Sequence, residues 1–124
     1  MVDLFIDTFN FNALTTASDA LWAGLPVVIK LGQGFVACVA GSLLTAIDLT
    51  ELITETETEY EALILDLATN PKRLDAIKQK LAGNRVSKPL FNTELFTKHL
   101  EDGYQQDYQR YFDGLEQDAI AVYD

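Results

Sequence analysis

Cysteine and histidine are almost absent from this sequence. Among its 124 residues, Cys38 is the one cysteine and His99 the one histidine. An internal disulfide, a zinc site of Cys and His ligands and a Cys–His nucleophile pair each need more of these side chains. His99 lies in an amphipathic helical pattern, "FTKHLED", which favours a surface or partly packed side chain over a catalytic one. We therefore expect neither a metal site nor a catalytic residue in this chain.

Basic residues and long apolar runs are also scarce. The chain has 9 Lys and Arg against 19 Asp and Glu, a formal net charge of -10. Such a surface repels phosphate backbones and anionic lipid, which disfavours nucleic-acid and membrane partners. The apolar runs are broken by Lys30, Gln33 and Asp48 and are too short to span a bilayer. The start, "MVDLFIDT", has no basic region typical of a signal peptide, so we predict a cytoplasmic protein.

The first part of the chain has the pattern of a βαβ unit. Val2–Ile6 and Leu25–Leu31 are apolar and typical of strands buried in a parallel sheet. Between them, "TASDALWAG" has a hydroxyl residue as cap, helix-forming residues and Gly24 as a stop signal. The stretch "GFVACVAGSLLTAI" then predicts a second, apolar helix. Strand, helix and strand over this length predict an α/β fold.

From residue 50 onward the pattern is helical. Thr56 and Glu59 match a capping box, and Asn70 before a proline starts a helix that we expect to end at Gly83. Asn92 caps a last, long helix. That helix has an aromatic and apolar row at spacings of three and four, which we expect to pack against the rest of the protein. The row consists of Phe96, Leu100, Tyr104, Tyr108, Tyr111 and Phe112.

Only two strands are evident, and two parallel strands do not form a stable sheet by themselves. We therefore expect the chain to be the end of a larger α/β domain, cut at its N-terminal side. The exposed strand edges would then favour self-association or another partner.

One loop is a candidate ligand site. In open α/β sheets, ligands bind beyond the carboxyl ends of strands and near helix N-termini. Asp7–Thr16 occupies that place: Thr15 and Thr16 offer hydroxyls and backbone N–H groups suited to a diphosphate, and Asp19 could accept hydrogen bonds from a ribose diol. On the same residues, an alternative interpretation is purely structural, with threonine as a helix cap and Asp19 as a favourable charge near the helix start.

Several segments resemble a known family. "DTFNFNALTTASDALWAGLPVVI", "SLLTAIDLTELI", "EYEALILDLATNPKRL" and "SKPLFNTELFTKHLEDGYQQ" resemble, in order, the C-terminal end of the protein O-linked N-acetylglucosamine transferases, including their bacterial SPINDLY-like relatives. The pairing of "TT..DALWAGLPVV" with a later "PLFNT" is specific to that family. The resemblance implies a GT-B fold, two Rossmann-like domains around a cleft, and transfer of N-acetylglucosamine from UDP-GlcNAc to protein Ser or Thr. It also implies a nucleotide-sugar substrate without a cofactor or metal.

The resemblance places the chain in the second, nucleotide-binding domain. Residues 1–114 would be the C-terminal part of that Rossmann-like domain, a helix-rich α/β segment. Its βαβα part would span 1–49, its C-terminal helices 50–114, and an acidic tail 115–124. Matched position by position, Thr15 and Thr16 correspond to threonines at the UDP diphosphate, and Asp19 to an aspartate at the ribose.

The chain departs from the family around this loop. The family's Asn-Gly-His-Thr-Thr is here Asn-Ala-Leu-Thr-Thr, so Ala13 replaces a glycine and Leu14 replaces a histidine that can donate a hydrogen bond. Ala37 and Cys38 stand where the family has Ser and Arg. By the same resemblance, the acceptor-side residues, the uracil contacts and an essential lysine lie upstream, and Lys30 is not expected to replace that lysine because it lies in a strand.

Two functions follow from the resemblance and its gaps. The chain is either a truncated piece of a glycosyltransferase that holds part of the UDP site and is inactive alone, or a non-catalytic remnant that acts as a protein-interaction module. The first hypothesis predicts a partner that supplies the missing N-terminal catalytic half and binding of UDP or UDP-GlcNAc. The second predicts self-association without UDP binding. The sequence leaves open whether the chain is an enzyme.

Overall fold

The computed structural model describes residues 2–123, which divide into two compact units between Leu90 and Phe91. The first unit holds the sheet and most helices, and the second holds one long helix and the tail. The sequence boundaries, at 49/50 and 114/115, followed the pattern of elements and the family resemblance. The extent of the family domain, 1–114, stays a prediction.

A small parallel sheet forms the centre of the first unit. Its strands are β1 (Phe5–Ile6), β2 (Val27–Lys30) and β3 (Ile53–Thr54), hydrogen-bonded in the order β1-β2-β3. Phe5 pairs with Val27, and Ile29 with Ile53. The prediction of two strands was therefore wrong. The third strand has only two residues. Its pairing with β2 is a tertiary contact that the local sequence pattern does not indicate.

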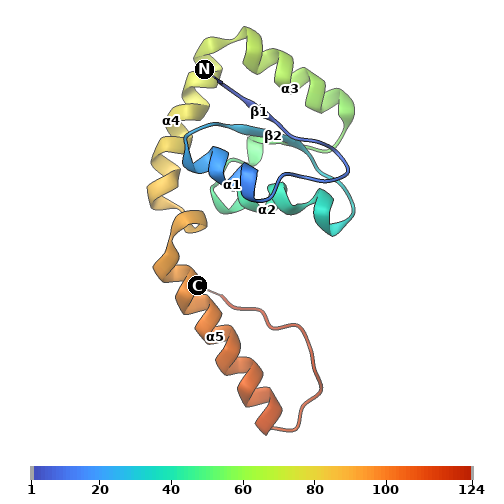
Figure 1. The fold of residues 1–124 in the computed structure, drawn as a ribbon, viewed down its shortest axis with the longest axis vertical. Helices are drawn as coiled ribbons and strands as arrows, with labels where there is room; N and C mark the ends of the chain where they lie inside the picture. Colours follow the sequence, from blue (N-terminus) through green and yellow to red (C-terminus); the bar gives the residue numbers. More distant parts are fainter. Residues whose placement is uncertain (1, 124) are drawn as a thin grey trace. The chain divides into compact units, whose positions relative to one another are not determined.

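Helices cover both faces of this sheet (Figure 1). On one side lie α1 (Thr15–Trp22) and α2 (Val39–Ala46), and on the other lies α3 (Glu57–Thr69). Short 3₁₀ turns at Phe35–Ala37 and Thr50–Leu52 lead into α2 and β3. The α/β, helix-rich class is thus confirmed. The largest side chains of the core are fully buried: Leu21, Ile29, Leu44, Ile47, Leu49, Leu52, Leu67 and Leu81.

β1 is shorter and less covered than predicted. It spans Phe5–Ile6 rather than Val2–Ile6, and the Ile6 side chain is half-exposed. The expectation of a strand covered on both faces was wrong for β1 because it lies at the edge of the sheet. β2, the central strand, fits that expectation, since Val27, Val28 and Ile29 are fully buried.

Three helix starts follow the predicted capping chemistry. The Glu59 backbone N–H donates to the Thr56 hydroxyl at 3.2 Å, and the Glu59 carboxylate accepts from the Thr56 backbone N–H at 3.1 Å, which completes the capping box. Asn70 caps α4 (Pro71–Ser87), and Asn92 caps α5 (Thr93–Phe112). Because each cap joins residues three positions apart, local sequence is sufficient to predict it.

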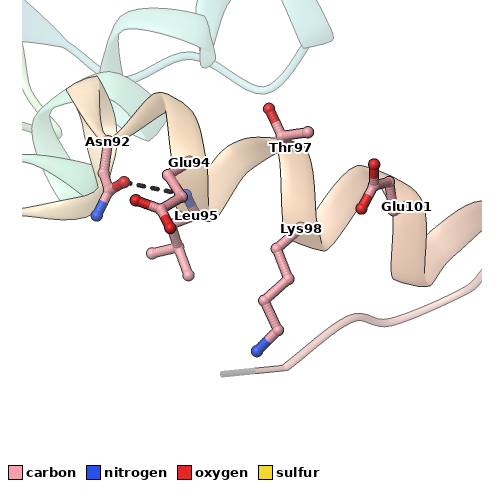
Figure 2. A pocket seen from close by; sticks show the side chains of 6 residues that line it. All are labelled: Asn92, Glu94, Leu95, Thr97, Lys98 and Glu101. Atoms are coloured by element: carbon pink, nitrogen blue, oxygen red, sulfur yellow. Dashed lines mark hydrogen bonds between the residues drawn. The ribbon is translucent and has the colours of Figure 1, made fainter.

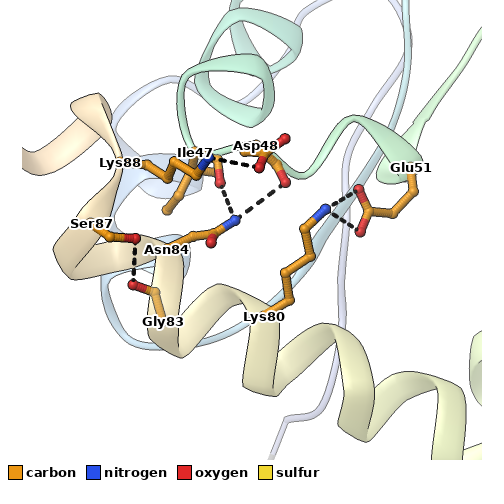
Figure 3. A network of polar contacts seen from close by, with 8 residues as sticks. All are labelled: Ile47, Asp48, Glu51, Lys80, Gly83, Asn84, Ser87 and Lys88. Carbon is orange, nitrogen blue, oxygen red and sulfur yellow. Dashed lines mark hydrogen bonds and ion pairs between the residues drawn. The ribbon is translucent and has the colours of Figure 1, made fainter.

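The predicted end of α4 at Gly83 was wrong. The helix continues to Ser87 because the residues after Gly83 have distant partners. The Asn84 amide donates to the Ile47 carbonyl at 2.8 Å and to the Asp48 carbonyl at 3.3 Å (Figure 3). The Arg85 guanidinium donates to the Trp22 carbonyl, and its Cζ lies 5.5 Å from the centre of the Trp22 ring. These contacts outweigh the weak helix propensity of one glycine, which costs about 1 kcal/mol.

Two ion pairs also join α4 and its C-cap residue to the segment between α2 and β3. Lys80 Nζ lies 2.9 Å from Glu51 Oε1, and Lys88 Nζ lies 2.9 Å from Asp48 Oδ2 (Figure 3). The Lys88 hydrogen bond and charge, with a smaller contribution from Lys80, hold the pKa of Asp48 below its ordinary value. Asp48 itself has φ 59°, a left-handed conformation that aspartate tolerates better than most residues.

The second unit, from Phe91 onward, contains α5 and the tail that follows. A short 3₁₀ turn at Pro89–Phe91 spans the boundary between the units and leads into α5. The tail returns along one side of α5: the Arg110 guanidinium donates to the Glu116 carbonyl at 2.6 Å, and a Cβ at Gly103 would lie 3.6 Å from Val122. Tyr104, Tyr108 and Tyr111 of the aromatic and apolar row line a hollow together with residues 115–117 of the tail. The members of the row are 44–78% exposed, and its packing against the first unit stays a prediction.

Candidate functional site

The two predicted threonines open α1. Thr15 and Thr16 are its first two residues, and the N-cap is Leu14, whose side chain accepts no hydrogen bond. The expectation of a hydroxyl cap was therefore wrong, because neither hydroxyl is bonded to the helix end. The first backbone bond of the helix is donated by the Ser18 N–H to the Leu14 carbonyl. Within residues 2–123, the N–H groups and hydroxyls of Thr15 and Thr16 have no hydrogen-bond partner.

Asp19 lies one turn further along α1. It is three positions after Thr16 and four after Thr15, so the three side chains lie on one face of the helix. All three residues are exposed, and the Asp19 carboxylate makes no ion pair or hydrogen bond within residues 2–123. The structure thus brings the predicted residues together. Free N–H groups with the positive end of the helix dipole suit an anion, and the carboxylate can accept from hydroxyls.

A buried aspartate holds the loop that leads into this helix. Asp7 follows β1, and its side chain is almost fully buried. Asp7 Oδ1 accepts from the Thr8 N–H at 2.8 Å and from the Ala13 N–H at 2.9 Å, and Oδ2 lies 3.0 Å from the same Ala13 nitrogen. The carboxylate thereby closes the loop over the six positions from Asp7 to Ala13. This arrangement fixes the chain two residues before Thr15.

Tyr60 of α3 supports the same aspartate from the other side. Its hydroxyl donates to the Asp7 backbone carbonyl at 2.7 Å, and its ring meets Phe9 edge-on with centroids 5.1 Å apart. Burial first, and then the negative charge of Asp7, raises the pKa of Tyr60 above its ordinary value. The hydroxyl therefore remains a donor through neutral pH.

Two further contacts give the loop its shape. The Thr8 hydroxyl donates to the Phe11 carbonyl at 2.6 Å, and the Asn12 amide donates to the Thr8 carbonyl at 3.0 Å. The Asn12 N–H donates to the Val36 carbonyl at 2.8 Å, which joins this loop to the one after β2. Asn12 is 1% exposed, and its side-chain oxygen has no partner among the described residues.

The surroundings of the loop are apolar and exposed. Leu14, at the position of the family's histidine, is 54% exposed, and Phe11 and Phe35 are 67% and 84% exposed. None of these side chains can donate a hydrogen bond. Lys30 is already engaged, because its Nζ lies 4.6 Å from the centre of the Phe9 ring and 3.4 Å from Glu57 Oε1.

Sequence reasoning found Thr15, Thr16 and Asp19 but missed the residues that hold their loop. Asp7 had a usable signal, since it follows a strand at the carboxyl edge of the sheet. Tyr60 had none, because it lies 53 residues from its partner. Only the fold brings α3 beside the end of β1.

A further surface feature lies outside the loop. A surface hollow of about 670 Å³ lies along the second unit, lined by side chains from α5 and its cap, among them Glu94, Lys98 and Glu101 (Figure 2). Within residues 2–123, no three His, Cys, Asp or Glu side chains are grouped so as to hold a metal ion. In the same range, each helix is too short or too polar to cross a membrane.

The sequence of this chain is similar to those of known glycosyltransferases. The model of the family described as Glycosyl transferase family 41 matches residues 1–100. A Hordeum vulgare protein named as a probable UDP-N-acetylglucosamine–peptide N-acetylglucosaminyltransferase SPINDLY is 35% identical over 114 residues, which are 92% of this chain and 12% of that protein. A Caenorhabditis elegans protein named as a UDP-N-acetylglucosamine–peptide N-acetylglucosaminyltransferase is 32% identical over 98% of this chain and 10% of its own length.

A solved structure agrees with these relatives. A mutant of the Thermobaculum terrenum O-GlcNAc transferase superposes with a TM-score of 0.79 and 31% identity, over 85% of this chain and 20% of that one. The similarity confirms the predicted resemblance and the GT-B character of the fold. This chain spans about an eighth or less of the length of the two relatives named above.

Proposed function

Because this chain belongs to glycosyl transferase family 41, we propose that it forms part of the UDP site of a protein O-N-acetylglucosaminyltransferase. In this proposal the whole enzyme transfers N-acetylglucosamine from UDP-GlcNAc to protein Ser or Thr in the cytoplasm, without a metal. By the family resemblance, the residues at the acceptor and the uracil lie outside the segment that this chain matches, so in this proposal residues 1–124 do not catalyse the transfer by themselves.

The observation that carries the proposal is the open first turn of α1. The Thr15 and Thr16 N–H groups and hydroxyls have no partner in the described residues, and both residues are exposed. A diphosphate at this position would accept from these donors, next to the positive end of the helix dipole. Asp19 would accept from the ribose hydroxyls on the same helix face. The net charge of -10 makes such local donors necessary for an anionic ligand.

The test is a titration of the isotope-labelled chain with UDP, followed through its amide NMR signals. We expect shifts centred on Thr15, Thr16 and Asp19, and Thr16→Val should abolish them because valine lacks the hydroxyl. Thr58→Val is the matched control, since Thr58 is the second residue of α3 as Thr16 is of α1, and it too is exposed. If UDP binds Thr16→Val as tightly as the wild type, the site assignment is wrong.

The second candidate function, a non-catalytic interaction module, rests on a different observation. The aromatic and apolar row of α5 is exposed, and so is Leu14 in the ligand loop. An exposed apolar surface of this kind is typical of an interaction site. Sedimentation at high protein concentration separates the two: self-association without UDP binding supports the module, whereas a monomer that binds UDP supports the glycosyltransferase segment.

A further inference from the structure

Asp7 is fully committed to the loop before α1. Its backbone N–H donates to the Val28 carbonyl at 3.0 Å, its carbonyl accepts from Tyr60, and its carboxylate accepts from Thr8 and Ala13. The residue therefore links the central strand β2, the helix α3 and the ligand loop. With 5% of its surface exposed, it has no free face to offer a ligand.

We propose that Asp7 is a positioning residue of the diphosphate subsite, which orients the first turn of α1 without contacting the ligand. The inference rests on the proposed function, because it concerns the same site. The Asp7–Ala13 bonds fix the chain two residues before Thr15, so the direction of the free Thr15 and Thr16 N–H groups depends on them. Preorganised donors hold an anion better than donors that must be ordered on binding.

The sign of one substitution separates positioning from simple electrostatics. Asp7→Asn removes a negative charge near an anion site, so if the charge alone mattered, UDP would bind more tightly. The new amide also places N–H donors where Oδ2 faces the Ala13 N–H at 3.0 Å, two donors that cannot bond each other. Positioning by Asp7 therefore predicts weaker UDP binding in this variant, by about three- to tenfold, roughly one hydrogen bond.

The experiment combines UDP titration with amide hydrogen exchange on the full chain. In Asp7→Asn we expect faster exchange at Ala13, weaker UDP binding and unchanged protection at Ile29 in the central strand. Asp75→Asn is the charge-matched control, because Asp75 is exposed on α4 and makes no hydrogen bond or ion pair with the described residues. It should leave both readouts as in the wild type.

The outcomes separate this inference from the proposed function. Equal or tighter UDP binding by Asp7→Asn, with Ala13 still protected, overturns the positioning role alone. If the wild type binds no UDP, the proposed function fails, and unchanged Ala13 exchange in Asp7→Asn then overturns the ordering of the loop by Asp7 as well. Should Asp7→Asn fail to fold, Asp7→Ala decides, since it removes the acceptor of the Ala13 N–H without adding a donor; unchanged or tighter UDP binding there contradicts the proposal.

Discussion

The Tyr60 hydroxyl and the Asp7 carbonyl are 2.7 Å apart, although the residues are 53 positions apart in the chain. This hydrogen bond joins α3 to the carboxyl end of β1, beside the loop that leads into α1. Tyr60 is 6% exposed, so both partners are shielded from water. The loop is thus held by the packed part of the first unit rather than by its own short-range contacts alone.

Removing this bond should destabilise the fold. Tyr60→Phe keeps the ring and its edge-on contact with Phe9 but leaves the Asp7 carbonyl without its donor. We expect a loss of about 1–3 kcal/mol in the free energy of unfolding, the cost of a buried acceptor left unpaired. Urea denaturation measures it, with Tyr104→Phe on the exposed face of α5 as control. An unchanged midpoint in Tyr60→Phe would show that water replaces the hydroxyl.

A second prediction concerns the tight turn after β2. A Cβ at Gly32 would lie 2.3 Å from the Ala37 Cβ, which is too close for two carbon atoms. The Gly32 N–H donates to the Ala37 carbonyl at 2.8 Å, so the two residues cannot easily separate. Gly32→Ala should therefore lower the free energy of unfolding by about 1–3 kcal/mol through overpacking.

Gly34 is the control for that substitution. It lies two residues further, and a Cβ there meets no atom within 4 Å. Thermal unfolding of Gly34→Ala should match the wild type, while Gly32→Ala unfolds at a lower temperature. Equal destabilisation by both variants would mean that the general stiffness of the turn, and not the contact with Ala37, sets the cost.

The third prediction follows from the capping box of α3. Hydrogen bonds from the Glu55 and Thr56 backbone N–H groups hold the pKa of Glu59 below its ordinary value of 4.5. A carboxylate with a lowered folded-state pKa contributes stability that is present above 4.5 and lost as the pH falls through its folded-state value. The first turn of α3 should therefore loosen in acid below that point.

The Thr56 amide signal in NMR spectra reports this loss as the pH is lowered. In Glu59→Gln the side chain keeps one acceptor but cannot titrate, so its Thr56 signal should lack the transition. Asp3 and Asp48 also have lowered pKa values, from contacts with Lys78 and Lys88, and remain in both proteins. A transition of the same size in the variant would assign the acid response to those residues instead.

Local chemistry made much of this fold predictable. The caps at Thr56, Asn70 and Asn92 join side chains to backbone groups three positions away, and each was read correctly from the sequence. The end of α1 also followed its sequence, because Gly24 has φ 85°, a conformation that glycine adopts without strain. These features depend on residues that are close in sequence, so they form without contacts from distant parts of the chain.

The errors arose where distant contacts decide local structure. β3 exists because Ile53 and Thr54 pair with β2, and α4 passes Gly83 because Asn84 and Arg85 bond to residues more than 30 positions earlier. At the site, Thr15 and Thr16 were identified from their place after a strand and from the family resemblance. Their unbonded hydroxyls could not be foreseen, because the loop shape comes from Asp7.

The fourth prediction tests the most evident departure from the family pattern. Leu14 stands where the family has a histidine, and its side chain is exposed directly before Thr15. Leu14→His places a hydrogen-bond donor beside the proposed diphosphate without creating a cavity in the core. A charge-assisted hydrogen bond contributes about 1.5–3 kcal/mol, so we expect UDP to bind about tenfold or more tightly.

The same UDP titration measures this gain, and its pH dependence identifies the cause. Imidazole carries its positive charge below a pKa of about 6.5, so the gain should grow as the pH falls through that value. Leu14→Gln is the control, because glutamine adds a neutral donor that does not titrate. A gain that is equal in both variants at every pH would show that any polar group suffices. No gain in either variant would mean that the side chain before Thr15 does not face the phosphates. That result would contradict the assignment of the family's UDP site to this loop.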